Sequence, residues 1–360
     1  MANIGILTFH RAINYGAVLQ AVALQKKIES LGTNSELIDY IDEEFKLEYG
    51  LQKNFKTNNP VAKAILFLIK NSLFLVKKHK FNKFLDSYSV LSKCKYTEKN
   101  LASSESNYST FVTGSDQVWN LKLTAGDKNY FLPFVPAEKK RSYAASFGFT
   151  TIPEGQEELY RGLLQDYKLA SIREITGCRL FENLTGNSSV QTIDPTFLYN
   201  GKQWIDLCSL RKKEGKYILF YSVAKPAKLI KYVEEYAKKH NLKVIEVTSA
   251  LKASSPSFSA ARCAGPKDFL ELILNAEFVA TTSFHATVFS VLFHKDFCSE
   301  LISGTGARNT RIDSILEMIG QENYLEKDMI ELKNLDWNEV DARLGAKRSE
   351  AENYIKSIIN

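Results

Sequence analysis

Short apolar segments typical of β-strands alternate with segments of helical periodicity along most of this 360-residue chain. Ile4 to Phe9 is strand-like, and Tyr15 to Leu31 carries apolar residues at helical spacing. The alternation restarts at Tyr217 to Val223 after a break near 200–216. Strands and helices that alternate without hairpin signals predict parallel sheets covered by helices. We therefore expect an α/β fold with two facing Rossmann-like domains.

The chain length fits two domains of ordinary size. We expect an N-terminal domain over 1–200, a second domain over 201–335, and a C-terminal helix over 336–360 that packs back on the first domain. Further predicted strands are Ser35 to Asp39, Phe111 to Thr113, Ser142 to Ser146, Val190 to Ile193, Lys243 to Val247, Ala276 to Ala280 and Lys295 to Cys298. Further predicted helices are Glu157 to Ala170, Ala227 to Lys239, Pro266 to Asn275, Arg311 to Ile319 and Trp337 to Ile359.

Charge and composition exclude several classes of protein. A hydrophobic content of 44% and a charged content of 24% are typical of a globular chain. The net charge of +6 suits an anionic ligand or an anionic membrane surface. No recognised nucleic-acid-binding module accompanies the basic residues, so no nucleic-acid partner is expected. The histidines are scattered and no carboxylates cluster at ligand spacing, so no metal site is expected.

The five cysteines are widely spaced and include no CxxC pair. They predict free thiols in a reducing compartment rather than a disulfide framework. No basic region precedes the apolar run that begins at Ile4, which favours a first strand over a signal peptide. We therefore expect a cytoplasmic protein.

An insertion at about 53–90 is both basic and hydrophobic. Between Lys53 and Phe84, lysines interleave with leucines and phenylalanines. One interpretation is an interfacial helix resting on anionic lipid, which would place the protein at the inner face of the cell membrane. The other, which we favour from the sequence, is a helical pair packed on the first domain. Liposome flotation with and without residues 58–84 separates the two.

The segment Thr281 to Thr287 follows an apolar run and predicts a strand, a tight turn and a helix, with His285 near the helix start. Ligands bind at the carboxyl edge of such strands, and a helix start suits an anion. His285 could then act as a proton donor beside a phosphate or carboxylate, with Thr282 and Ser283 as donor-binding residues. The alternative is a capping turn whose histidine only packs.

Two turns after predicted strands of the first domain are also candidates. In His10 to Gly16, Asn14 can cap the next helix and Gly16 lets a ligand approach the backbone, although a plain turn explains them equally. No GxGxxG follows this strand, which disfavours dinucleotide binding. In Gly114 to Asn120, polar groups could bind sugar hydroxyls and Trp119 could stack on a sugar. The alternative is a buried polar turn.

Three arginines are candidates for binding an anion. Arg173 comes directly after the small residues that follow a predicted helix, although Glu174 could simply pair with it. Arg308 and Arg311 follow a glycine-containing loop in the second half, and one of them could reach the cleft of His285. Two arginines and a histidine can hold a small anion that carries both carboxylate and phosphate, because guanidinium binds each in a forked geometry.

Taken together, these motifs resemble the polysaccharide pyruvyl transferase family, from about residue 3 to about residue 320. The matching segments are Asn14 to Gln20, Gly114 to Asn120, Tyr143 to Gly148, Ser171 to Glu174, Asp194 to Thr196 and Ser283 to His285. The resemblance implies a fold similar to the GT-B glycosyltransferase architecture. It also implies transfer of pyruvate from phosphoenolpyruvate to two hydroxyls of one sugar or lipid-linked oligosaccharide, giving a cyclic ketal, with phosphoenolpyruvate as co-substrate and no cofactor.

The resemblance assigns catalytic roles to three residues: His285 is the expected acid, and Arg173 and Arg311 hold the donor. The acceptor would meet Asn14, Tyr15, Gly16, Ser115, Asp116 and Trp119. Many relatives have glycine where this chain has Ala286, a change that removes no chemical group. The competing hypotheses are a nucleotide-sugar glycosyltransferase on the same scaffold and a non-catalytic glycan-binding or scaffold relative.

Overall fold

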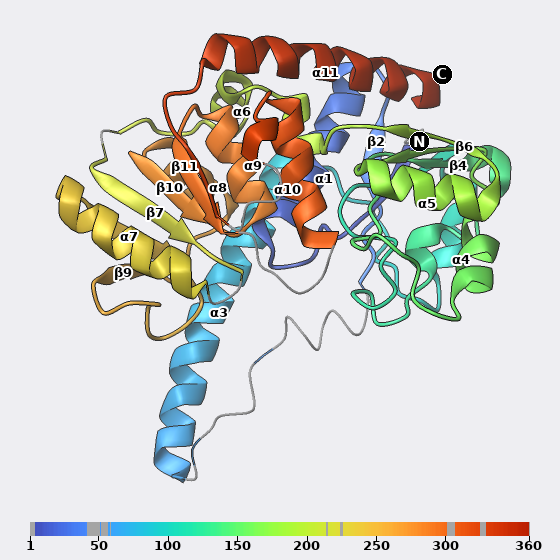
Figure 1. Cartoon of the computed structure of the whole chain (residues 1–360). Helices are drawn as coiled ribbons and strands as arrows, with labels where there is room; N and C mark the ends of the chain where they lie inside the picture. Colours follow the sequence, from blue (N-terminus) through green and yellow to red (C-terminus); the bar gives the residue numbers. More distant parts are fainter. Residues whose placement is uncertain are drawn as a thin grey trace.

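The computed structural model describes residues 4–41, 51, 57, 59–213, 215–223, 226–300, 307–324 and 329–359, and in these it has two α/β domains (Figure 1). The first sheet is parallel, in the order β2-β1-β3-β4. Isolated bridges at Ala145 connect it to a second parallel pair, β5-β6. The strands are β1 (Ile4–Leu7), β2 (Ser35–Leu37), β3 (Thr110–Thr113), β4 (Lys140–Ser142), β5 (Leu169–Ile172) and β6 (Ser188–Gln191).

The second domain contains a six-stranded sheet in the order β12-β11-β10-β7-β8-β9. Five of its strands are parallel, and β12 runs antiparallel to β11 at one edge. The expectation of purely parallel pairing is therefore wrong at that edge, and β9 and β12 were not expected. The strands are β7 (Tyr217–Tyr221), β8 (Lys243–Val247), β9 (Phe258–Ala261), β10 (Phe278–Thr281), β11 (Asp296–Glu300) and β12 (Met329–Leu332).

Most predicted helices are observed, with ends that agree within a few residues, and one predicted helix is too long. The predicted helix Glu157 to Ala170 ends at Leu164, because Leu169–Ile172 forms β5 and pairs with β6. The short helices α5 and α6 were not expected. The described helices are α1 (Tyr15–Ser30), α3 (Pro60–Tyr88), α4 (Glu157–Leu164), α5 (Ile175–Thr185), α6 (Gly201–Cys208), α7 (Ala227–His240), α8 (Pro266–Leu274), α9 (Phe284–Leu292), α10 (Ala307–Met318) and α11 (Trp337–Ile359).

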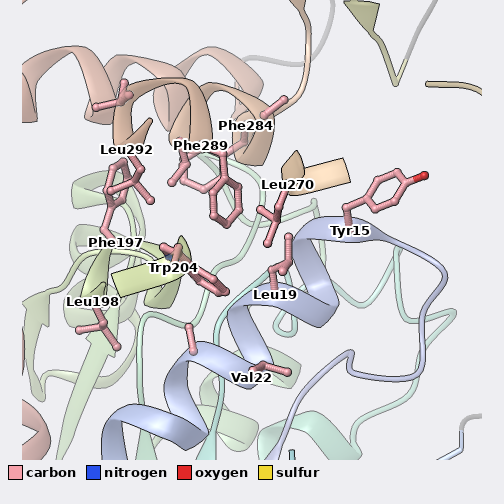
Figure 2. Close-up of a cluster of buried hydrophobic side chains, with 14 of the residues drawn as sticks. Tyr15, Leu19, Val22, Phe197, Leu198, Trp204, Leu270, Phe284, Phe289 and Leu292 are labelled. Atoms are coloured by element: carbon pink, nitrogen blue, oxygen red, sulfur yellow. The ribbon is translucent and has the colours of Figure 1, made fainter. Parts of the chain in front are cut away.

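Helix α1 joins the two domains through one continuous hydrophobic core. Figure 2 shows Leu19 and Val22 of α1 in the same cluster as Leu270 of α8 and Phe289 of α9. Tyr15 belongs to the same contact: its ring stacks on Phe269 with centroids 4.3 Å apart, and its hydroxyl donates a hydrogen bond of 2.8 Å to the Ala264 carbonyl. Every residue of α1 from Tyr15 to Gln25 is buried, as expected of a helix packed between two domains.

Helix α3 is one continuous helix of 29 residues, so the expected helical pair is wrong. Asn59 caps its start and Pro60 occupies its first turn. Phe81, Phe84 and Leu85 bury its C-terminal part against the body, while its N-terminal part extends away from the rest of the described chain (Figure 1). Among the described helices, none combines the length and the apolar character that crossing a bilayer requires.

Helix α11 contacts the first domain. The Tyr354 hydroxyl donates to the Ser142 carbonyl at 3.0 Å, and Lys27 pairs with Glu352 at 2.7 Å. Tyr354 and Ile355 are buried in the core that includes α1. The last helix therefore packs across both domains, and the exact domain boundaries near 200 and 335 stay predictions.

The Tyr15 contact predicts a measurable coupling between the domains. Tyr15→Phe leaves the buried Ala264 carbonyl without its donor, and we expect the free energy of unfolding to fall by about 1–2 kcal/mol. The matched control is Tyr199→Phe, because the described structure gives that hydroxyl no hydrogen-bond partner. Urea unfolding followed by circular dichroism measures both variants, and an equal loss in the two would contradict the assigned contact.

Candidate functional site

A cleft with a volume of about 1220 Å³ lies between the two domains. Its walls come from the segments that follow strands β1, β3, β7 and β10, which are the carboxyl edges where open α/β sheets bind ligands. The residues lining this interdomain cleft include Asn14, Ala17, Asp116, Gln117, Gly148, Tyr221, Thr282, Ser283, His285, Glu300 and Arg311.

The start of helix α9 faces this cleft and holds His285. Ser283 is the N-cap residue, and its hydroxyl accepts a bond of 3.4 Å from the Ala286 amide. Thr282 is held in turn by the Val223 amide, which donates to its hydroxyl at 3.1 Å. His285 is 8% exposed and lines the cleft. The turn therefore presents two hydroxyls, one imidazole and a helix N-terminus, a combination that suits an anion.

Gly16 packs directly against the imidazole of His285. A Cβ atom at position 16 would lie 1.9 Å from Nδ1 of His285, a distance that no real contact reaches. The glycine that was expected to admit a ligand therefore admits the histidine from the other domain. Asn14 caps α1, as predicted, by accepting bonds from the Gly16 and Ala17 amides.

A buried carboxylate, Asp194, lies on the other side of the imidazole. Its Oδ2 atom is 3.5 Å from Nε2 of His285, 2.9 Å from Nη1 of Arg173 and 3.2 Å from the Ser115 hydroxyl. Its Oδ1 atom accepts bonds from the amide and hydroxyl of Thr196 at 3.0 and 2.6 Å. Asp194 is therefore a rigid centre that connects the histidine of one domain with the arginine of the other.

Arg173 is held between two carboxylates. Its guanidinium pairs with Asp194 and, through Nε at 3.2 Å, with Glu174, whose Oε1 also accepts a bond of 2.6 Å from the Ser146 hydroxyl. Its carbon Cζ lies 4.9 Å from the centre of the Phe284 ring, a cation–π distance. The side chain is only 4% exposed, so Arg173 is locked in place before any ligand arrives.

Arg173 does not line the interdomain cleft. It lines a second pocket with a volume of about 430 Å³, which we call the inner pocket, together with Asp194, Phe284, Arg311 and Tyr354. Phe284 and Arg311 line both hollows, so the two adjoin at these side chains. Arg173 is thus connected to the cleft by its contacts with Asp194, which lies beside His285, and with Phe284, which lines both hollows.

The electrostatics of this cluster keep Asp194 ionised. Burial alone raises the pKa of the Asp194 carboxyl, but His285 and Arg173 lower it more, and the net pKa lies well below the usual range. Burial lowers the pKa of Arg173, while Glu174 and Asp194 raise it more, so the guanidinium stays charged.

Of the expected acceptor residues, some line the cleft and others are buried away from it. Asn14 and Asp116 line the cleft. Asp116 has a φ of 79°, a conformation that is uncommon for residues other than glycine and often occurs at functional sites. Ser115 bonds Asp194, so it supports the buried cluster instead. Tyr15 is buried in the contact between domains, which leaves it no acceptor-binding role in this conformation.

Trp119 requires a correction, because its side chain is fully buried. Its ring stacks near Phe131 and Phe181 in the core of the first domain. It offers no face to a sugar, so the alternative interpretation, a buried turn, fits this residue. The indole is instead part of the hydrophobic core of the first domain.

Arg308 and Arg311 lie in α10. Arg311 lines the cleft, whereas the side chain of Arg308 is outside the described residues. In the part of the chain that the structure describes, no three histidine, cysteine, aspartate or glutamate side chains gather as metal ligands. Arg311 is thus the cation of α10 that the described structure places at the cleft.

Asp194 is the site residue to which sequence reasoning assigned no role. The segment Asp194-Pro195-Thr196 follows β6, and Asp194 caps the short 3₁₀ turn Pro195–Leu198. An aspartate before a proline at the carboxyl end of a strand is a signal that could have marked the position. Its partners lie 21, 79 and 91 positions away in the chain, which a single sequence does not reveal.

The Gly16 contact predicts a strong effect from one methyl group. We expect Gly16→Ala to displace the His285 ring, to shift its imidazole resonances, and to lower the free energy of unfolding by about 1–3 kcal/mol. Gly162→Ala is the matched control, since its Cβ would meet nothing within 4 Å in helix α4. Long-range ¹H–¹⁵N spectra of the five histidines measure the displacement. Unshifted His285 resonances in Gly16→Ala would contradict the packing.

The Asp194 cluster predicts a stability that depends on pH. Asp194→Asn leaves Arg173 short of a buried partner, and we expect a loss of about 3–5 kcal/mol at pH 7. A carboxyl whose pKa is lowered by folding stabilises above its unfolded pKa of about 3.9, and this contribution is lost as the pH falls further. The part of the gap that comes from the ionised Asp194 carboxylate should therefore be fully present above about pH 4 and decrease below it.

Urea unfolding between pH 3 and pH 8 measures this gap. Asp206→Asn is the control, because Asp206 forms an exposed pair with Lys202 and should change stability by less than about 1 kcal/mol. A gap between wild type and Asp194→Asn that stays constant down to pH 3 would rule out the assigned ionisation.

Comparison with known proteins assigns the chain to a family. The model of the polysaccharide pyruvyl transferase family matches residues 14–299. No curated protein matches the chain significantly. Among solved structures, MnaA of S. aureus in complex with UDP is 12% identical, with a TM-score of 0.50 over 98% of this chain and 91% of that chain.

Two further solved structures are similar in shape. UDP-GlcNAc 2-epimerase from Neisseria meningitidis bound to UDP-GlcNAc is 11% identical, with a TM-score of 0.47 over 100% of this chain and 94% of that chain. The glycosyltransferase SnogD from Streptomyces nogalater is 11% identical, with a TM-score of 0.41 over 100% and 98%. At such identities the likeness to solved structures concerns the fold alone, which is GT-B-like with two facing Rossmann-like domains. From the family match over most of its length, the chain belongs to the polysaccharide pyruvyl transferase family.

Proposed function

We propose that the protein transfers pyruvate from phosphoenolpyruvate to two hydroxyls of one sugar, forming a cyclic ketal and free phosphate. The main support for the proposal is the position of His285, which lies at the start of α9 and lines the cleft. Its imidazole is 3.5 Å from the buried Asp194, which forms an ion pair with Arg173. This arrangement supplies a proton donor beside an anion-binding helix start, which are the two features that an enol phosphate donor requires.

The donor is expected to bind at the second-domain wall of the cleft. The first amides of α9 and the hydroxyls of Thr282 and Ser283 can donate hydrogen bonds to phosphate oxygens, and Arg311 adds a positive charge. These groups are set by secondary structure, so little reorganisation is needed when the anion binds. Arg308 lies about one turn before Arg311 in α10, and we propose that it also contacts the phosphoenolpyruvate donor.

In the reaction that we propose, protonated His285 delivers its proton to carbon 3 of the donor, and carbon 2 becomes electrophilic. One sugar hydroxyl bonds to carbon 2 and gives its proton to the neutral imidazole. The bond from carbon 2 to the phosphate oxygen breaks and phosphate leaves. The second hydroxyl then closes the ring at carbon 2 and gives its proton to Asp116, the candidate base at the cleft.

Arg173 has a different role in this proposal from a direct donor contact. Its ion pairs with Asp194 and Glu174 are already formed, and it lines the inner pocket. We therefore assign it as a positioning residue that holds Asp194 ionised beside His285. Asp194, 3.5 Å from Nε2 of His285, orients the imidazole in the way that a buried carboxylate supports a catalytic histidine.

The acceptor is expected on the first-domain wall of the cleft, where Asn14, Asp116 and Gln117 present polar groups. Asp116 is the candidate base for an acceptor hydroxyl. The family supports a sugar or polysaccharide as the acceptor class. A volume of about 1220 Å³ leaves room for more than the small donor.

Phosphate release from phosphoenolpyruvate, measured with a panel of galactoside and mannoside acceptors, tests the proposal. We expect His285→Ala to lower kcat by about 10²–10⁴-fold, because the general acid is removed. His240→Ala is the control, since His240 ends helix α7 at an exposed position. Arg311→Ala should mainly raise the KM for phosphoenolpyruvate. Mass spectrometry should detect a pyruvyl ketal on the acceptor.

A positioning role for Arg173 predicts more than a loss of rate. Arg173→Lys should retain part of kcat, whereas Arg173→Ala should lose it and also change the pH dependence of kcat, because Asp194 no longer faces a fixed cation. Near-wild-type phosphate release by both His285→Ala and Arg173→Ala would overturn the proposal. Binding of a nucleoside diphosphate sugar without any phosphate release would favour the glycosyltransferase hypothesis.

A further inference from the structure

Helix α3 carries an exposed apolar stripe on the side that does not pack against the protein. Val61, Ile65 and Leu68 are 66%, 52% and 64% exposed, and Leu75 and Val76 continue the stripe. At about 100° per residue, these five positions fall within an arc of roughly 100° around the helix. Exposed apolar patches of this kind mark interaction sites in soluble chains.

The opposite side of α3 packs against the rest of the protein. Phe81, Phe84 and Leu85 are buried there, and the Lys77 ammonium lies 4.8 Å from the centre of the Tyr15 ring. Lys77 also donates to the Ser249 hydroxyl at 3.1 Å, and burial lowers its pKa to about 8. The exposed stripe is therefore not needed to hold the helix in place. The N-terminal part of the helix extends beyond the body of the protein (Figure 1).

The charges along α3 are all of one sign until its last turn. From Pro60 to Leu85 the helix has six lysines and no aspartate or glutamate. Lys63, Lys78 and Lys83 are exposed, whereas Lys80 is paired with Asp268 at 2.7 Å. At about 100° per residue, Lys83 falls within the arc of the stripe and Lys78 near its edge, whereas Lys63 lies on the opposite side of the helix. An apolar stripe that adjoins exposed lysines fits a surface that is both apolar and anionic, because each lysine near such a surface adds attraction.

From this juxtaposition we propose that α3 docks on the surface of an anionic lipid bilayer, with Val61, Ile65, Leu68, Leu75 and Val76 inserted among the lipid headgroups and acyl chains. A second copy of this chain is a poorer occupant, since pairing two α3 helices would bring six lysines of each helix together with a single acidic residue, Asp86 in the last turn. The inference does not depend on the proposed function, because membrane binding can be measured without turnover.

Vesicle flotation of the full-length protein tests the docking. We expect the protein to float with phosphatidylcholine vesicles that contain 30% phosphatidylglycerol, and to float far less with phosphatidylcholine alone. Ile65→Ser/Leu68→Ser should lower vesicle binding by on the order of tenfold or more, since two exposed apolar side chains are lost. Binding should also weaken in 0.5 M salt, which screens the lysines.

The matched control is Val90→Ser/Leu169→Ser, which removes two apolar side chains of comparable exposure outside α3. It should float like wild type. To place the contact on α3, Leu68→Trp should show a blue shift of its emission on anionic vesicles, whereas Leu169→Trp should not. Thermal melting confirms that each variant is folded, as expected for exposed positions.

Three results would overturn the proposal. One is a failure of the wild type to float with anionic vesicles. Another is equal flotation of wild type and Ile65→Ser/Leu68→Ser. The third is a dimer in light scattering that Ile65→Ser/Leu68→Ser dissociates while no vesicle binding is seen, which would show that a second copy covers the stripe. Loss of phosphate release in any variant bears only on the proposed function.

Discussion

The packing of α1 between the two domains is the contact on which the rest of the structure depends. Its side chains enter the same hydrophobic core as those of α8 and α9, and Tyr15 stacks on Phe269 at its first turn. The following residue, Gly16, can approach the His285 ring only because it has no Cβ. One helix start in the first domain therefore sets both the joint between the domains and the position of the imidazole.

The buried cluster around Asp194 follows from that joint. Ser115 and Arg173 belong to the first domain and His285 to the second, so Asp194 meets His285 only when the domains are packed as observed. Burying the charges of Asp194 and Arg173 costs free energy unless ion pairs and hydrogen bonds compensate for the lost water. Both carboxylate oxygens of Asp194 have such partners. The cluster and the domain joint thus support each other.

Much of this fold could be predicted from the sequence, because its elements are short and strongly patterned. Strand β8 and helix α11 were predicted to the residue, and α1 to within one. Strands β9 and β12 were missed because they lie at sheet edges, where half-exposed residues weaken the apolar signal. The predicted helix Glu157 to Ala170 was too long because helical spacing cannot show that Ala170 pairs in a sheet.

The sequence predicts several residues of the site but not which of them contact one another. His285 and Arg311 line the cleft and Arg173 is linked to them, yet whether Trp119 stacks on a ligand or fills a core depends on residues far away in the chain. The same limit applies to α3. Its apolar residues surround the whole helix, so periodicity could not tell which side packs. The buried Lys77 beside Tyr15 identifies the side of α3 that packs on the protein. The apolar stripe from Val61 to Val76 faces solvent, so burial within the fold does not explain its apolar character.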